Sequence, residues 1–75
     1  MDEIHELVEK GKSFLEQGNY DDALAFFEQA LLLNQDDPDL WNYKGVALRS
    51  IGRHQEAMDC FNKSLEIDPR DKKSS

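Results

Sequence analysis

Apolar residues recur along this chain at the spacing of amphipathic helices, in four stretches that polar or glycine-containing breaks separate. The breaks fall at residues 18–19 (Gly-Asn), 34–37 (Asn-Gln-Asp-Asp), 52–53 (Gly-Arg) and 68–69 (Asp-Pro). A residue that precedes proline is disfavoured in the helical region, so the fourth stretch ends at the last of these breaks. The pattern predicts an all-α fold of four short helices.

The apolar positions of each stretch predict the face that each helix buries. These faces comprise Ile4, Leu7, Val8, Gly11, Phe14 and Leu15; then Tyr20, Ala23, Leu24, Phe27, Ala30 and Leu31; then Leu40, Trp41, Gly45, Ala47, Leu48 and Ile51; and finally Ala57, Met58, Phe61, Leu65 and Ile67. Asp37 and Pro38 predict the start of the third helix, because aspartate is a favourable N-cap and proline suits the first helical position.

The chain repeats itself with a period of about 34 residues. Shifting it by this period aligns identical residues at Lys10 and Lys44, Gly11 and Gly45, Gly18 and Gly52, Ala23 and Ala57, Phe27 and Phe61, Leu31 and Leu65, and Asp37 and Asp71. Residues 1–75 are therefore expected to form one domain of two equivalent helix pairs. The first pair covers about 4–37, the second about 38–71, and 72–75 form a polar tail.

Two glycines, Gly11 and Gly45, lie inside predicted helices, where glycine costs about 1 kcal/mol relative to alanine. Such a cost is typical of a site where two helices approach closely. We expect Ala23 and Ala57 at the matching points of the partner helices. The large side chains that fill the remaining space are Phe14, Phe27, Trp41 and Phe61.

These residues closely resemble the tetratricopeptide repeat family over roughly residues 4–71. The second unit supplies Trp41, Gly45, Leu48, Gly52, Ala57, Phe61 and Pro69, and the first supplies Leu7, Gly11, Phe14, Gly18, Tyr20, Ala23, Phe27 and Ala30. The chain departs from the family pattern at Leu7, Gln35, His54 and Ser64, and at Lys10 and Lys44, where leucine is usual. These departures predict looser packing between some helices.

The resemblance implies a right-handed superhelix of antiparallel helix pairs that acts in protein binding and scaffolding, and not as an enzyme. The first helix of each pair then lines a concave groove for a peptide or partner helix. The matching positions are His5, Val8, Lys12, Leu15, Asp39, Asn42, Tyr43, Val46 and Arg49.

Within this groove, Tyr43 is expected to anchor a ligand, Asn42 to bond its backbone, and Lys12 and Arg49 to receive an acidic group. The alternative is that these residues form ordinary solvated helix faces. The carboxylate clamp of chaperone-binding family members is not expected. Val8, Lys12 and Tyr43 stand where its lysine and asparagines would be.

Charge limits the classes of partner that the chain is expected to bind, and cysteine content indicates the compartment in which it is expected to fold. The 16 acidic and 9 basic residues give a net charge of −7, which disfavours nucleic acid and anionic membranes. The single cysteine, Cys60, cannot form an internal disulfide, so a reducing, cytoplasmic setting is expected. No stretch has the length and apolarity of a membrane span or a signal peptide.

No residue pattern points to catalysis, a metal or a cofactor. His5 and His54 are too far apart in sequence to make a metal motif or a triad, and Cys60 lacks an activating basic cluster. The acidic run 36–39 lacks the glycine and the distant glutamate of a calcium loop.

Self-assembly into a homodimer or a higher oligomer is the alternative function. Repeat arrays normally need three or more units and a polar cap, and no amphipathic capping helix is expected after Pro69. The expected open edge consists of Met58, Cys60, Phe61 and Leu65.

Overall fold

The computed structural model describes residues 3–68, which form four α-helices. Helix α1 spans Glu3–Gln17, α2 spans Tyr20–Leu33, α3 spans Pro38–Ser50 and α4 spans His54–Ile67. The predicted all-α class and the breaks between the four helices are confirmed. Pro69, Asp71 and the polar tail lie outside the described residues.

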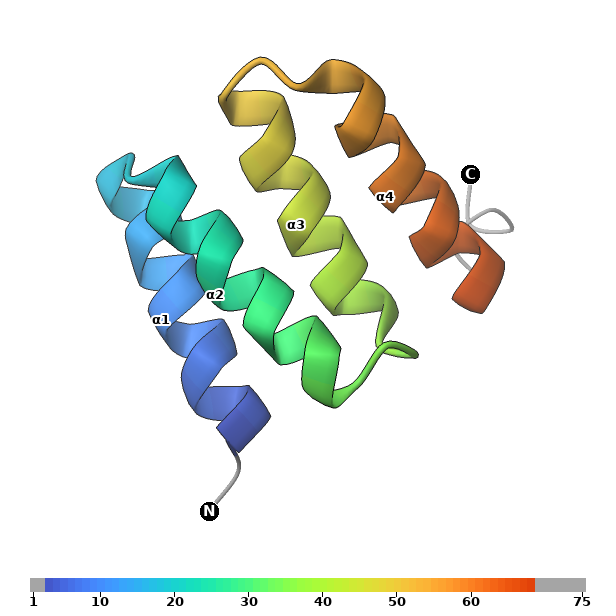
Figure 1. Cartoon of the computed structure of the whole chain (residues 1–75), viewed down its shortest axis with the longest axis horizontal. Helices are drawn as coiled ribbons and strands as arrows, with labels where there is room; N and C mark the ends of the chain where they lie inside the picture. The colour runs from blue at the N-terminus through green and yellow to red at the C-terminus, as the bar shows by residue number, and fades with distance from the viewer. Residues whose placement is uncertain (1–2, 69–75) are drawn as a thin grey trace.

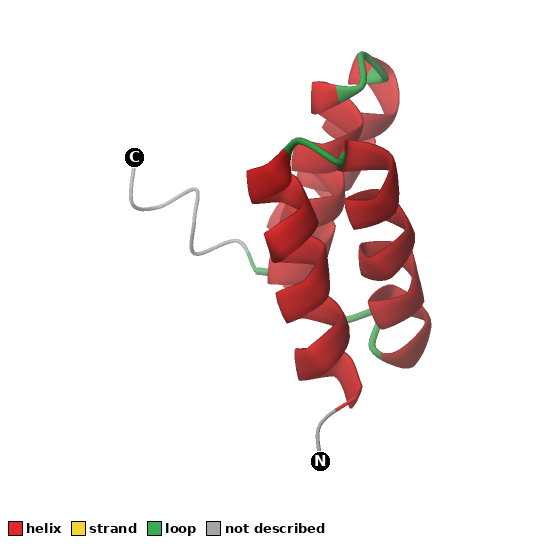
Figure 2. Ribbon diagram, turned by 90° about the vertical axis from the view of Figure 1, so that its left-hand side faces the viewer, coloured by secondary structure: helices red, strands yellow, loops and turns green. Residues whose placement is uncertain are grey.

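The helices pack in the order of the chain (Figure 1). Helices α1 and α2 form one antiparallel hairpin, α3 and α4 form a second, and α2 packs against α3 to join them. Helix α1 also contacts α3. Figure 2 shows the molecule from the side, and its extents of 32 × 31 × 19 Å describe a flat slab.

Two turns and one cap set where the helices end. Gly18 and Gly52 have φ values of +84° and +88°, in the left-handed region that favours glycine, and each follows the first helix of its hairpin. At the junction between the hairpins, the backbone N–H of Asp39 donates a 3.0 Å hydrogen bond to Asp37 Oδ1. Asp37 is thus the predicted N-cap of α3, which begins at Pro38.

The core consists of two clusters that share one tryptophan. The first comprises Leu24, Ala47, Leu48, Ala57 and Cys60, and the second Ala30, Leu31 and Leu40. Trp41 packs against both clusters. Its indole N–H donates a 2.8 Å hydrogen bond to the carbonyl of Gln35, so this side chain also holds the loop between the hairpins.

The mid-helix glycines mark close approaches, as predicted, but the nearest neighbour is an aromatic ring. A Cβ at Gly11 would lie 2.5 Å from Cε1 of Phe27, and one at Gly45 would lie 2.6 Å from Cε1 of Phe61. Ala23 and Ala57 are buried without being the nearest contacts of these glycines. Sequence spacing identified the two helices that meet but not the large side chain that fills the contact.

The predicted open edge on α4 is confirmed at Met58 and wrong at Cys60. Met58 was assigned both to the buried stripe and to the open edge, and it is 58% exposed, because α3 is the only described helix that contacts α4 and it does not cover this position. Cys60 was expected on the open edge but is only 4% exposed, because it points into the cluster that α3 and α4 share. Cys60 therefore acts as a small apolar core residue.

Candidate partner-binding groove

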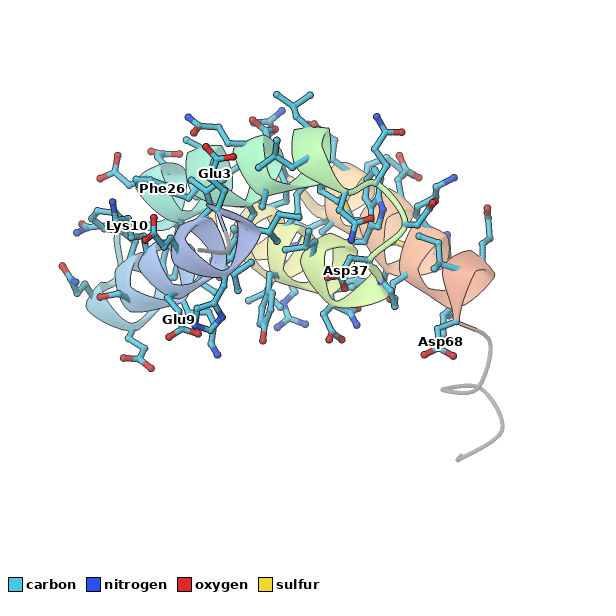
Figure 3. The ribbon with its side chains drawn as sticks, turned by 90° about the horizontal axis from the view of Figure 1, so that it is seen from below. Glu3, Glu9, Lys10, Phe26, Asp37 and Asp68 are labelled. Atoms are coloured by element: carbon cyan, nitrogen blue, oxygen red, sulfur yellow. The ribbon has the colours of Figure 1, made fainter. Side chains whose placement is uncertain are left out.

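Helices α1 and α3 contact each other on the side of the slab opposite α2, as the view along the helices shows (Figure 3). The predicted groove residues lie on these two helices. Lys12, Val8, Leu15, Asn42, Tyr43 and Val46 are half-buried, whereas His5, Asp39 and Arg49 are exposed. This surface is referred to below as the α1/α3 face.

Tyr43 is held in place by the core beneath it. Its ring stacks on the fully buried ring of Phe27, with 5.2 Å between ring centroids and 16° between ring planes. Phe27 in turn packs against Gly11. A rigidly supported, half-exposed aromatic ring can offer a large contact area to a ligand at little cost in side-chain entropy.

The ammonium group of Lys12, in the first hairpin, lies close to the ring of Tyr43, in the second. Lys12 Nζ lies 5.8 Å from the centroid of the Tyr43 ring, within the range of a cation–π contact. The same ammonium group lies 3.7 Å from Glu9 Oε2. Figure 3 shows Glu9 pointing outward from α1. Exposed ion pairs of this kind contribute little stability, so a ligand carboxylate can replace Glu9 at small cost.

Arg49 brings a second cation to the α1/α3 face near the end of α3. Its guanidinium carbon lies 5.8 Å from the centroid of the Phe61 ring. Among residues 3–68 it has no carboxylate partner. A guanidinium without a carboxylate partner keeps all its donors for a planar anionic group.

Other predicted groove residues serve the fold as well. Val8 packs against one core cluster and Leu15 against the other, so only part of each side chain faces outward. The carbonyl of Val46 accepts a 2.9 Å hydrogen bond from Ser50 Oγ. The structure therefore brings Lys12 and Tyr43 together, and leaves Val8 and Leu15 as supports.

A cavity on the opposite side of the slab was not predicted. It measures about 630 Å³, lies between α2 and α3, and is lined by Ala25, Glu28, Gln29, Leu31, Leu32, Gln35, Trp41 and Lys44. Lys44 Nζ lies 3.7 Å from Glu28 Oε2 and 5.5 Å from the Trp41 ring centroid. The sequence signal for this cavity is Lys44, which stands where leucine is usual. A lysine keeps its ammonium group in water and therefore fills less of the space between two helices than a leucine does.

Within residues 3–68, no three or more His, Cys, Asp or Glu side chains are grouped so as to hold a metal ion. Burial raises the pKa of the Cys60 thiol, which makes it a poorer nucleophile. None of the described helices has the length and apolarity needed to cross a lipid bilayer.

A sequence profile of the tetratricopeptide repeat matches residues 8–72. The chain belongs to the tetratricopeptide repeat family. The two hairpins, each with a mid-helix glycine packed on a phenylalanine, are its two repeats. Tetratricopeptide repeats are non-catalytic modules that generally bind other proteins.

Relatives of this tetratricopeptide repeat chain include both short and long proteins. It is 37% identical over 59 residues to an uncharacterized protein of Methanocaldococcus jannaschii, a match that covers 79% of this chain and 69% of that protein. It is 36% identical over 73 residues to human anaphase-promoting complex subunit 7, covering 97% of this chain and 13% of that subunit. It is 34% identical over 59 residues to the peroxisomal targeting signal receptor of Candida albicans, covering 79% of this chain and 10% of the receptor.

Proposed function

We propose that the chain binds a peptide or a partner helix along the α1/α3 face. Tyr43 is the apolar anchor, and Lys12 and Arg49 receive acidic groups of the ligand. The observation that carries the proposal is the contact of Lys12 with Tyr43, because it joins a cation of one hairpin to a supported aromatic ring of the other. Asn42, half-buried beside Tyr43, supplies an amide for the ligand backbone.

The names of two relatives are consistent with this proposal. One is a subunit of a multiprotein complex, and another is a receptor for a targeting signal. The chain spans only 13% and 10% of these proteins, so the similarity supports a binding role without specifying a ligand.

The proposal is tested by titrating an acidic peptide that contains one aromatic residue into the isotope-labelled chain. Amide shifts are expected at Lys12, Tyr43 and Arg49. The double variant K12Q/R49Q should weaken binding roughly tenfold, which corresponds to about 1.4 kcal/mol. The variant K63Q is the matched control, because Lys63 is an exposed cation on α4. Shifts confined to α4, or equal weakening by K63Q, would contradict the proposal.

Self-assembly remains the second candidate function, and the exposure of Met58 is the observation that favours it. Sedimentation equilibrium at increasing protein concentration tests it. A monomer up to high concentration would exclude it, whereas a dimer that Met58→Glu dissociates would support it.

A further inference from the structure

Lys44 lies on α3 between two cavities, on the side of the slab opposite the α1/α3 face. The cavity of about 630 Å³ between α2 and α3 is described above, and a second cavity of about 310 Å³ lies between α3 and α4. Lys44 and Trp41 line both of them. The walls belong to α2, to α4, to the α3 helix between them (Figure 1) and to the loop before α3, which all fall within residues 3–68.

The position of Lys44 shows which chemistry the larger cavity favours. Its ammonium group lies 5.5 Å from the centroid of the Trp41 ring and 3.7 Å from Glu28 Oε2. An aromatic face and a carboxylate both attract a cation, and here they do so at one point. Leu31 and Leu32 add apolar surface to the wall of the same cavity. The cavity is therefore suited to a cation that has an apolar neighbour.

Lys44 can leave this position and still face a carboxylate. Its ion pair with Glu28 is weak, because the two side chains are 23% and 52% exposed. On the other side of Lys44, the smaller cavity is lined by Glu56 and Asp59. The pKa of Glu56 is lowered mainly by its hydrogen bonds with Arg53 and also by the charge of Lys44, so this carboxylate lies within electrostatic reach of the ammonium group.

The charges that line the two cavities favour a cationic ligand. They comprise three carboxylates, of Glu28, Glu56 and Asp59, and two ammonium groups, of Lys44 and Lys63. The whole chain has a net charge of −7, which attracts a cation over a longer range. A second copy of the chain carries the same net charge and is repelled, so it is a poor occupant.

We infer that the cavity between α2 and α3 binds an arginine of a partner protein that has an aliphatic residue next to it. The guanidinium lies on the Trp41 ring and pairs with Glu28, and the aliphatic side chain contacts Leu32, which is 78% exposed. Lys44 moves toward Glu56. A planar guanidinium with two parallel donors matches an indole face and a carboxylate better than an ammonium group does. The inference does not depend on ligand binding at the α1/α3 face.

The arginines of the chain itself do not suit this role. Arg53 and Arg49 are engaged with side chains of α4. Arg70 belongs to a segment, 69–75, that contains no leucine, isoleucine, valine, methionine or aromatic residue. This segment therefore offers no aliphatic side chain for Leu32, and a partner supplies both groups.

The single tryptophan of the chain provides the signal for the experiment. The peptide acetyl-Leu-Arg-Leu-amide is titrated into the full chain while the NMR signal of the Trp41 indole N–H is followed. This signal is expected to move, and Glu28→Gln should weaken binding roughly tenfold. Glu66→Gln is the matched control, because Glu66 is an exposed carboxylate on α4 that lines neither cavity. Peptides with lysine or glutamate in place of the arginine should bind more weakly.

A second variant separates displacement of Lys44 from attraction by the net charge. Lys44→Gln should tighten binding of the arginine peptide about threefold, because the guanidinium no longer competes with an ammonium group for Glu28. Lys10→Gln is the matched control, since it removes the same charge from the equivalent position of the first repeat. It should change the affinity clearly less. Circular dichroism of each variant verifies that the helices are retained.

Each contrary outcome overturns the inference. If the indole signal moves neither in the unmodified chain nor in Lys44→Gln, the cavity does not bind arginine. Equal binding of the lysine or the glutamate peptide would show that the guanidinium is not what the cavity recognises. If Arg70→Gln moves the indole signal without any peptide, the occupant is the chain's own terminal segment. Equal tightening by Lys44→Gln and Lys10→Gln would mean that Lys44 does not compete for the site.

Discussion

The two mid-helix glycines press against phenylalanine rings that differ in their freedom to move. Gly11 faces Phe27, which is fully buried and stacked against the Tyr43 ring. Gly45 faces Phe61, which is half-buried, and α3 is the only described helix that contacts the α4 helix carrying this ring. The same added methyl group therefore meets a fixed ring in the first repeat and a movable ring in the second.

We predict that Gly11→Ala destabilises the chain by about 1–3 kcal/mol, because overpacking outweighs the gain of about 1 kcal/mol in helix propensity. Gly45→Ala should be nearly neutral, since Phe61 can shift toward solvent. Urea denaturation followed by circular dichroism measures both values. Equal losses in the two variants would show that the rings are held with similar rigidity.

Ser64 is the one described residue with a buried side-chain polar atom that lacks a hydrogen-bond partner. It is 1% exposed and occupies the position that Ala30 fills in the first repeat. Ser64→Ala should stabilise the chain by about 1 kcal/mol, because it removes an unsatisfied hydroxyl and improves helix propensity. Ser13→Ala is the control, since Ser13 is exposed and its hydroxyl accepts a bond from Gln17. Loss of stability in Ser64→Ala would indicate that the hydroxyl finds a partner in solution.

At the scale of the element, the starts of α2 and α3 differ in how they are capped. Asp37 Oδ1 accepts the N–H of Asp39, whereas Asn19 makes no side-chain capping bond to α2. Asp37→Ala should therefore cost about 1 kcal/mol, and Asn19→Ala clearly less. Thermal unfolding of the two variants at neutral pH gives the comparison. A larger loss for Asn19→Ala would show that α2 is capped differently in solution.

Helix α4 begins with a bidentate pair, in which Arg53 donates to the two oxygens of Glu56 at 2.7 and 2.6 Å. These hydrogen bonds lower the pKa of Glu56 below its ordinary value of 4.5. A lowered pKa in the folded state means that the stabilisation is present above the unfolded-state value and is lost as pH falls through the folded-state value.

For this reason, Arg53→Gln should lower Tm slightly at pH 7 and leave it unchanged near pH 2. The effect is small because both side chains are exposed. Lys63→Gln serves as a control for the loss of one positive charge. A difference in Tm between Arg53→Gln and the unmodified chain that persists at low pH would rule out the carboxylate as its origin.

The elements themselves could be read from the sequence because local signals set them. Glycines at 18 and 52 and the cap at Asp37 each act within a few residues. The repeat period then fixed which helices pair. What could not be predicted depends on neighbours distant in sequence: the Phe27 ring against Gly11 and the burial of Cys60 on the expected open edge.

In the candidate groove, too, the local pattern could be predicted from the sequence, but the contacts between distant residues could not. The family pattern placed nine residues on the first helices of the repeats, and the structure brings Lys12 and Tyr43 into contact. The family pattern could not show that Val8 and Leu15 turn partly into the core. Helical periodicity alone does not distinguish a residue at the edge of the groove from one at the edge of the core.

At the scale of the whole molecule, the reactivity of the Cys60 thiol measures how often the folded chain opens. Its thiol is 4% exposed in the cluster shared by α2, α3 and α4, and burial raises its pKa. Labelling by a thiol reagent at pH 8 should be slower than in urea by on the order of 100-fold, which corresponds to an opening free energy of about 3 kcal/mol. Fast labelling without urea would mean that α4 detaches from the rest of the chain.

The bond from Trp41 to the Gln35 carbonyl has a practical consequence for spectroscopy. This chain has a single tryptophan, and it sits where the two hairpins meet, in contact with both core clusters. Its fluorescence emission therefore reports separation of the hairpins, whereas ellipticity reports the helices themselves. A shift of the emission at a lower urea concentration than the one at which ellipticity is lost would mean that the two hairpins separate before their helices unfold. In that case the contact between the repeats is the least stable part of the molecule.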